Sequence, residues 1–402
     1  MDLIQLPPNA LRLGQVLTFS VRDANGKLLF ATGQVLHDSP QVRSLIEHGA
    51  FALAHETKEY QRQLAHKVDT MMHQGAVLGE IAKAQAVYKP DPKVEKRSFA
   101  SDLDAWNEIQ SHAHALLRDP KPIDFLPRFE TLHAEMMQLL QRNADALLTL
   151  LVHDASRDFR QYSSKHGLLC MALAELCGQR LGWSDAWRAA LTRAALSLNV
   201  RISVAQDRLA ASSDTFTPEQ REQLMHLSYL NADYLRSLGV TDPLWLDTLA
   251  VRHETGPGPL ADRSPAEQLA RLLSRIDIFA ARLSPRRSRA ALSAGSAARA
   301  VFLDELKHPD EAGAALVKAV GLYVPGSLVR LVNGEVGIVF KRGPNANEPL
   351  VAALMGKSGN PLADPVPRDT RLASQAVAGS LAPHELKLNI NLEKLHRLYR
   401  LA

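Results

Sequence analysis

Three ionisable side chains fall on the apolar faces of three separate predicted helices: His166, His253 and Asp277. Burying an acid costs free energy unless the group is paired or bound to a metal ion. Two histidines and one aspartate form part of a ligand set that suits a transition metal. If the three helices share one core, these residues predict a partial metal site.

Each of these residues also has an ordinary structural interpretation. A single histidine on a helix face is usually a core residue with one hydrogen bond, and the spacing does not show that the three side chains converge. Spacing alone slightly favours this structural role. If the three converge without metal, we expect the Asp277 carboxylate to pair with a histidine or with Arg252, because an unpaired buried charge costs several kcal/mol.

The elements that must position these residues are helices with clear start signals. Two capping boxes and one Asp-Pro pair mark three helix N-termini. These signals are Thr217-Pro218-Glu219-Gln220, Asp242-Pro243 and Ser264-Pro265-Ala266-Glu267. Apolar residues at helical spacing indicate a further helix over residues 163–179. We therefore expect residues 159–320 to form one helical domain.

A small β-rich module is predicted before this domain, in residues 1–56. Residues 16–21 and 27–30 are strand candidates, and Asn25-Gly26 between them is a hairpin signal because both residues tolerate positive φ. Residues 57–158 begin with a polar stretch and continue with apolar residues at helical spacing. They predict a helical connector, which is also a candidate for dimerisation.

A second β-rich module is predicted in residues 321–402. Val329 and Leu331 alternate with polar residues before Asn333-Gly334, and a second alternating stretch follows that turn signal. Residues 386–401 predict an amphipathic terminal helix. The predicted fold class is therefore mainly α, a helical bundle flanked by a small N-terminal and a small C-terminal β-rich module.

Composition and charge limit the classes of function. The 47 Lys and Arg residues exceed the 43 Asp and Glu residues by only 47 − 43 = 4, too few to predict a nucleic-acid partner. The first residues lack the basic and apolar regions of a signal peptide, and no long apolar run predicts a membrane span. Cys170 and Cys177 lie too far apart along one predicted helix for a disulfide. We expect a cytoplasmic protein.

Tyr162-Ser163-Ser164-Lys165-His166 stands at the start of the first predicted helix of this domain. This motif resembles the first helix of HD-GYP domains, the helical metal-dependent phosphodiesterases that hydrolyse cyclic di-GMP, and in that family the helix supplies a histidine ligand. The resemblance extends over residues 160–340. Asp277 matches the family's later metal-binding aspartate. Residues 323–331 and 334–337 resemble the segment that follows many HD-GYP domains. The resemblance implies a helical HD-GYP-like fold with His166, His253 and Asp277 as a relic metal site.

The same resemblance implies that most of the metal ligands are lost. The family's His-Asp dipeptide aligns with Ser197 and Leu198, and the first histidine of its His-His-Glu aligns with Arg252. A leucine cannot bind a metal ion, a serine is a poor ligand, and a guanidinium repels a dication. Two-metal chemistry needs ligands at these positions.

Accessory residues follow from the same alignment. Glu254 is retained after His253, and a further family histidine aligns with His226 or with its neighbour Leu227. Three cations match family positions that are expected to bind phosphate through charge-assisted hydrogen bonds. They are Arg201, Arg286 and Arg289.

Three functions stay open. The first is a catalytically inactive bacterial signalling protein that senses cyclic di-GMP or another nucleotide, or serves as a scaffold for a signalling protein, alone or as a homodimer. The second is an active phosphodiesterase with an unusual, single-metal site. The third is an HD-related protein-interaction module. We expect little hydrolysis and no resident cofactor, with one weakly bound Fe or Mn ion as the alternative.

Overall fold

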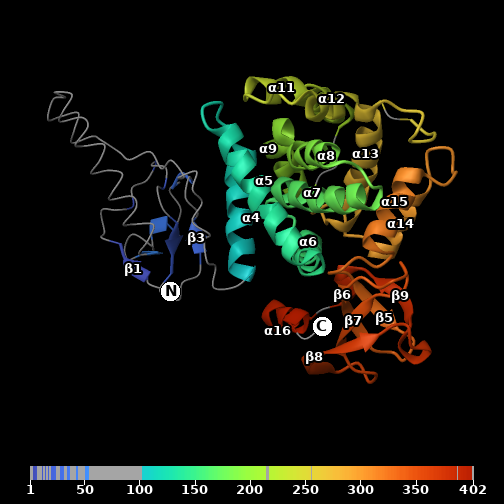
Figure 1. Cartoon of the computed structure of the whole chain (residues 1–402). Coiled ribbons are helices and arrows are strands. Elements are labelled where there is room, and N and C mark those ends of the chain that lie inside the picture. Colours follow the sequence, from blue (N-terminus) through green and yellow to red (C-terminus); the bar gives the residue numbers. More distant parts are fainter. Residues whose placement is uncertain are drawn as a thin grey trace. The chain divides into compact units, whose positions relative to one another are not determined.

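The computed structural model describes residues 102–213, 217–254, 256–386 and 388–400, together with part of residues 3–53. The chain divides into two compact units, Met1–Ala115 and Leu116–Ala402. Helices dominate the described residues, and an antiparallel sheet occurs near each end of the sequence (Figure 1). This confirms the predicted fold class, mainly α with a small β-rich module at each end.

The N-terminal unit contains a four-stranded antiparallel sheet in the order β1-β4-β2-β3. Its strands are β1 (Leu3–Gln5), β2 (Val21–Arg22), β3 (Leu28–Phe30) and β4 (Phe51–Leu53). Val21 pairs with Phe30, so the predicted hairpin is present, although its turn at 25–26 lies outside the described residues. Of the strand expected over 16–21, the structure describes β2 from Val21, and the Leu17 backbone N–H donates to the Gln34 carbonyl at 2.7 Å, whereas residues 16, 18 and 19 lie outside the described residues.

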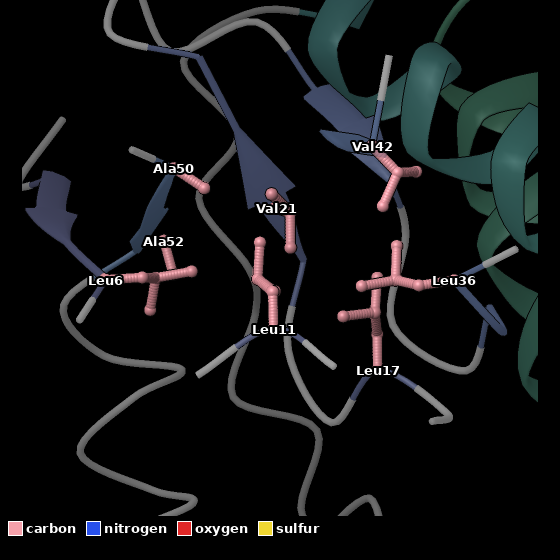
Figure 2. Packing of buried hydrophobic residues seen from close by; sticks show 8 residues of the cluster. All are labelled: Leu6, Leu11, Leu17, Val21, Leu36, Val42, Ala50 and Ala52. Atoms are coloured by element: carbon pink, nitrogen blue, oxygen red, sulfur yellow. The ribbon is translucent and has the colours of Figure 1, made fainter. Parts of the chain in front are cut away.

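Small and branched apolar side chains form the core of this unit (Figure 2). They are Leu6, Leu11, Leu17, Val21, Leu36, Val42, Ala50 and Ala52. Arg22, beside this core, forms a buried ion pair with Glu108 of helix α4 (Asp102–Arg118). Because neither charge could be buried alone, the pair links the sheet to α4.

The larger unit is a set of helices that continue through residue 320. They are α5 (Phe125–Arg142), α6 (Ala144–Arg157), α7 (Tyr162–Arg180), α8 (Asp185–Ser197), α9 (Ser203–Ala211), α10 (Pro218–Tyr229), α11 (Asn231–Ser237), α12 (Pro243–Val251), α13 (Pro265–Leu283), α14 (Ala294–Phe302) and α15 (Glu311–Val320). A short 3-10 helix, η2 (Val200–Ile202), follows α8. Within the described ranges, no helix is long and apolar enough to cross a membrane.

The helix N-termini lie where the sequence places them. Thr217 and Ser264 accept from the backbone of the third helical residue, and the Gln220 and Glu267 side chains bond back, so both capping boxes are formed. The Asp242 side chain accepts from the Trp245 backbone N–H at 3.1 Å. Four helices predicted from local signals are thereby confirmed as α7, α10, α12 and α13.

Helices α5 and α6, which fall within the predicted connector of residues 57–158, pack against α7 in the larger unit. A literal His-Asp pair, His153-Asp154, lies on α6, and His153 is buried rather than at the helix surface. Its side chain is buried and lies 3.3 Å from an Arg157 guanidinium nitrogen. Burial lowers the pKa of His153, so a neutral ring is favoured.

The C-terminal sheet has five antiparallel strands in the order β8-β7-β6-β5-β9. They are β5 (Leu328–Leu331), β6 (Val336–Lys341), β7 (Leu350–Met355), β8 (Pro361–Asp369) and β9 (Val377–Leu381). The predicted hairpin joins β5 to β6, with Gly334 at a φ of 87° in its turn. In the same unit, β6 packs beside α6 and β9 beside α14 (Figure 1).

The terminal helix expected over 386–401 is shorter than predicted. Helix α16 covers Leu392–Arg397, and Asn391 caps its N-terminus by accepting from the Lys394 backbone N–H. The preceding apolar residues Leu386, Leu388 and Ile390 alternate and pack against the core of the sheet. This period of two suits an extended segment rather than a helix.

A buried cluster of charges fixes α13, the helix that carries Asp277. Arg271 and Arg275 project from α13, are almost completely buried, and both bond the Asp310 carboxylate, which also caps α15. Glu305, half exposed, bonds both arginines at 2.9–3.0 Å. The two guanidinium groups are therefore paired, and α13 is held against α15.

Asp310→Asn should keep the cap on α15 while leaving the two arginines short of one negative charge. We expect the free energy of unfolding to fall by about 3 kcal/mol, the lower end of the range for a broken buried ion pair, because Glu305 remains. Chemical denaturation at neutral pH measures this change. Asp242→Asn, at another N-cap, should change it by less than about 0.5 kcal/mol, since Asn and Asp cap equally well. Equal losses in both variants would contradict this role of the Asp310 charge.

Candidate functional site

His166 and Asp277, predicted to lie together, are in direct contact. His166 is buried on α7, and its Nε2 donates to Oδ1 of Asp277 on α13 at 2.7 Å. The Tyr162 ring stacks on the imidazole with centroids 5.6 Å apart, and Cys170 Sγ lies 3.5 Å from Nε2. The pairing expected for Asp277 in the absence of metal, with a histidine or with Arg252, is therefore present.

Arg252, directly after α12, provides the cation of this site. Its side chain is only 9% exposed, and one guanidinium nitrogen lies 4.0 Å from Oδ2 of Asp277. The guanidinium also donates to the Leu198 carbonyl at 3.2 Å and to Oγ of Ser228 at 3.2 Å. One side chain thus connects the end of α8, helix α10 and helix α13.

His253 faces Arg252 and Ser228. The Arg252 Nε–H donates to His253 Nε2 at 3.0 Å, and Ser228 Oγ lies 2.9 Å from the same nitrogen. A guanidinium has only donors, so Nε2 must accept and the ring is neutral. Although His253 as a whole is exposed, desolvation of its ring beside Arg252 and then the charge of Arg252 lower the pKa of His253 to about 4, against the opposing effect of Asp277.

The Asp277 carboxylate is ionised. Burial by itself raises the pKa of this group, but the hydrogen bond from His166 and the positive charge of Arg252 hold it at about 2. Although the side chain is 34% exposed, its two oxygens face His166 and Arg252. We name this set of residues, His166, Ser228, Arg252, His253 and Asp277, the Arg252 network.

The donors at this site do not fit a metal ion. Among the described residues, no group of three or more His, Cys, Asp or Glu side chains is arranged to hold one. His166 Nε2 is committed to Asp277, and His253 Nε2 accepts from Arg252. The Ser197 hydroxyl accepts from Trp245 and donates to a backbone carbonyl, so it too is engaged. A dication added here would also be repelled by the guanidinium.

The expected accessory residues lie at the surface. His226 and Glu254 are both exposed, and their side chains take no part in the hydrogen bonds of the Arg252 network. Helix α10 presents Ser228 to the site instead, two residues after His226. Leu227, the alternative to His226, is half-buried and lacks a polar atom on its side chain.

The three arginines expected to bind phosphate are engaged within the chain. Arg201 lies over the Tyr234 ring at 4.8 Å, and Arg286 lies over the Tyr162 ring at 5.2 Å. Arg289 donates to backbone carbonyls at the C-terminal end of α13, including that of Ser284 at 3.1 Å. Burial lowers the pKa of Arg289, and the nearby charge of Arg286 lowers it further.

In structure, the chain is similar to Bd1817, a HDG"Y"P protein from Bdellovibrio bacteriovorus, with 18% sequence identity and a TM-score of 0.44. The similarity covers 78% of this chain and 98% of that chain. No protein-family model and no curated protein matches this chain.

Sequence reasoning missed two members of the site's surroundings. Ser228 sits on a mostly polar helix, so neither its burial nor its bonds to Arg252 and His253 could be read from periodicity. Tyr162 was noted only as part of a motif, yet its ring stacks on His166 and also contacts the Arg286 guanidinium. An aromatic residue four positions before a buried histidine is the one signal that indicated this stack.

Arg252→Gln should raise the pKa of His253 from about 4 toward its ordinary value near 6.5, because the repelling charge is removed. NMR titration of the imidazole resonances measures the change. His133 is an internal control: burial and Arg193 hold its pKa at about 4, so it should not move. An unchanged His253, or a parallel shift of both rings, would contradict the proposed contact.

The lowered pKa of His253 also makes the free energy of unfolding depend on pH in a definite direction. Between pH 6.5 and about 4 the unfolded chain takes up a proton at His253 that the native chain does not. The free energy of unfolding therefore falls as the pH falls through this window. Arg252→Gln should weaken the contribution of His253 to that fall.

Proposed function

We propose that this protein is a non-hydrolysing signalling protein of the bacterial cytoplasm, built on an HD-GYP-like helical domain. The observation that supports the proposal is the Arg252 guanidinium, which contacts Asp277, His253 and the Leu198 carbonyl. By the sequence resemblance, metal ligands would stand at positions 198 and 252. At position 252, where a catalytic domain would need a metal ligand, this chain has the permanently charged guanidinium of Arg252.

The chemistry of phosphodiester cleavage explains why this substitution matters. A two-metal site activates water and neutralises the phosphate with ions about 3.5–4 Å apart. When bound, such ions would supply both the nucleophile and the charge. The Arg252 network offers no free general base, because His253 Nε2 already accepts from Arg252 and the Asp277 carboxylate is paired with His166 and Arg252. The network is suited to holding helices together.

The arrangement of the other arginines favours a protein partner over a nucleotide at this site. Arg201 and Arg286 each stack on a tyrosine, and Arg289 bonds the end of α13. Freeing them for phosphate would cost these contacts. We therefore propose a scaffold or interaction module whose partner is a signalling protein, with self-association as a homodimer as the alternative.

Full-length protein incubated with cyclic di-GMP and Mn²⁺ or Fe²⁺ under reducing conditions should release no linear product above the buffer background. The expected reason is the lack of a ligand set for two metals around Arg252. Chromatography of the nucleotides measures turnover, and elemental analysis of the purified protein should give far less than one Fe or Mn per chain. Steady multiple turnover that His253→Ala abolishes would overturn the proposal in favour of a phosphodiesterase with an unusual site.

A further inference from the structure

A large cavity lies elsewhere in the helical unit and includes no residue of the Arg252 network. It forms where the C-terminal ends of α5, α7 and α15 meet the loop of residues 342–349 between β6 and β7. Its volume is about 900 Å³. This lies within the usual range of ligand pockets, and junctions between structural layers are common places for them.

Cations outnumber acids around this cavity. The charged lining side chains are Arg142, Arg180, Lys318 and Arg342 against Asp145 and Glu175, which gives 4 − 2 = +2. Basic residues at helix C-termini ordinarily offset the negative end of the helix dipole, so the partial charges of the helix ends reduce this positive charge. Three C-terminal ends contribute about −1.5 charges and the N-terminus of α6 about +0.5. A positive surplus of about one charge is left in the cavity.

Both acids are already neutralised by neighbours. Asp145 is ion-paired with Arg342, whose guanidinium also donates to the Ala319 carbonyl at 3.0 Å. Glu175 is buried, accepts from Gln179 at 2.7 Å and lies 3.5 Å from Nε of Arg188. These carboxylates are therefore not offered to a ligand as free negative charges.

Two of the cations are available to a ligand. Arg180 and Lys318 are exposed, and in the described part of the chain neither side chain has a hydrogen-bond or ion-pair partner. They extend from the last turns of α7 and α15. The opposite wall is preformed, since the Leu322 backbone N–H donates to the Ala346 carbonyl at 2.8 Å and Asn345 bonds Glu348 at 2.7 Å.

We infer that this cavity binds a small phosphate ester with two or more negative charges, held by Arg180 and Lys318 through charge-assisted hydrogen bonds. A side-chain guanidinium and ammonium on two different helices suit a ligand with two phosphate groups. The cavity is large enough for a nucleoside or a sugar attached to them. The inference does not depend on whether the Arg252 network hydrolyses anything.

Isothermal titration of the full-length protein with inorganic pyrophosphate tests the inference, with parallel titrations of adenosine diphosphate and a sugar bisphosphate. We expect saturable pyrophosphate binding that weakens as salt is raised, because exposed charges are screened. Arg180→Gln combined with Lys318→Gln should weaken it at least tenfold. Arg208→Gln removes an exposed cation of α9 that does not line the cavity, and it should leave the affinity unchanged.

Each result of these titrations either supports the inference or overturns it. Tighter binding of the nucleotide or of the sugar bisphosphate than of pyrophosphate, lost in the double variant, supports the inference and identifies the organic part of the ligand. Absence of binding by all three probes overturns it. Equal weakening by Arg208→Gln and by the double variant also overturns it, because the attraction would then come from the overall charge of the protein.

Discussion

The pairing of a buried guanidinium with a carboxylate is the interaction on which the helical core around α7 depends. Arg252 directly follows α12 and Asp277 lies on α13, and each charge would be costly in this position without the other. Their pairing requires α13 to approach the end of α12, and the bonds to Leu198 and Ser228 draw in α8 and α10. His166 completes the set from α7. The packing of these helices and the pairing of the charges therefore depend on each other.

Much of this architecture could be predicted because its signals are local. The capping boxes at Thr217 and Ser264 depend on residues three positions apart, and the β5–β6 hairpin depends on one turn. Part of the site was predictable for a different reason. An aspartate on an apolar helix face must find a partner, and Asp277 finds both of the partners that the sequence suggested.

The remaining features depend on neighbours that are distant in sequence. Arg252 donates to the carbonyl of Leu198, 54 positions earlier in the chain, and hydrophobic periodicity does not indicate this bond. It does not indicate the burial of Ser228 either. The burial of His153 comes from the tertiary packing of α6 and is not indicated by its neighbours in sequence. Helix α16 begins only at Leu392, and before it Leu386, Leu388 and Ile390 pack against the core of the sheet. Tertiary packing decided each of these cases.

A positive charge that comes from an arginine differs from one that comes from a bound metal ion in how it relates the fold to its surroundings. A bound ion stabilises a protein by mass action, so that stability follows the free concentration of the ion. The guanidinium of Arg252 is part of the chain, so it is present beside Asp277 in every folded molecule. The charge at the centre of these helices is therefore indifferent to chelators and to scarcity of iron or manganese. A domain arranged in this way can keep one shape while the metal content of the cell varies.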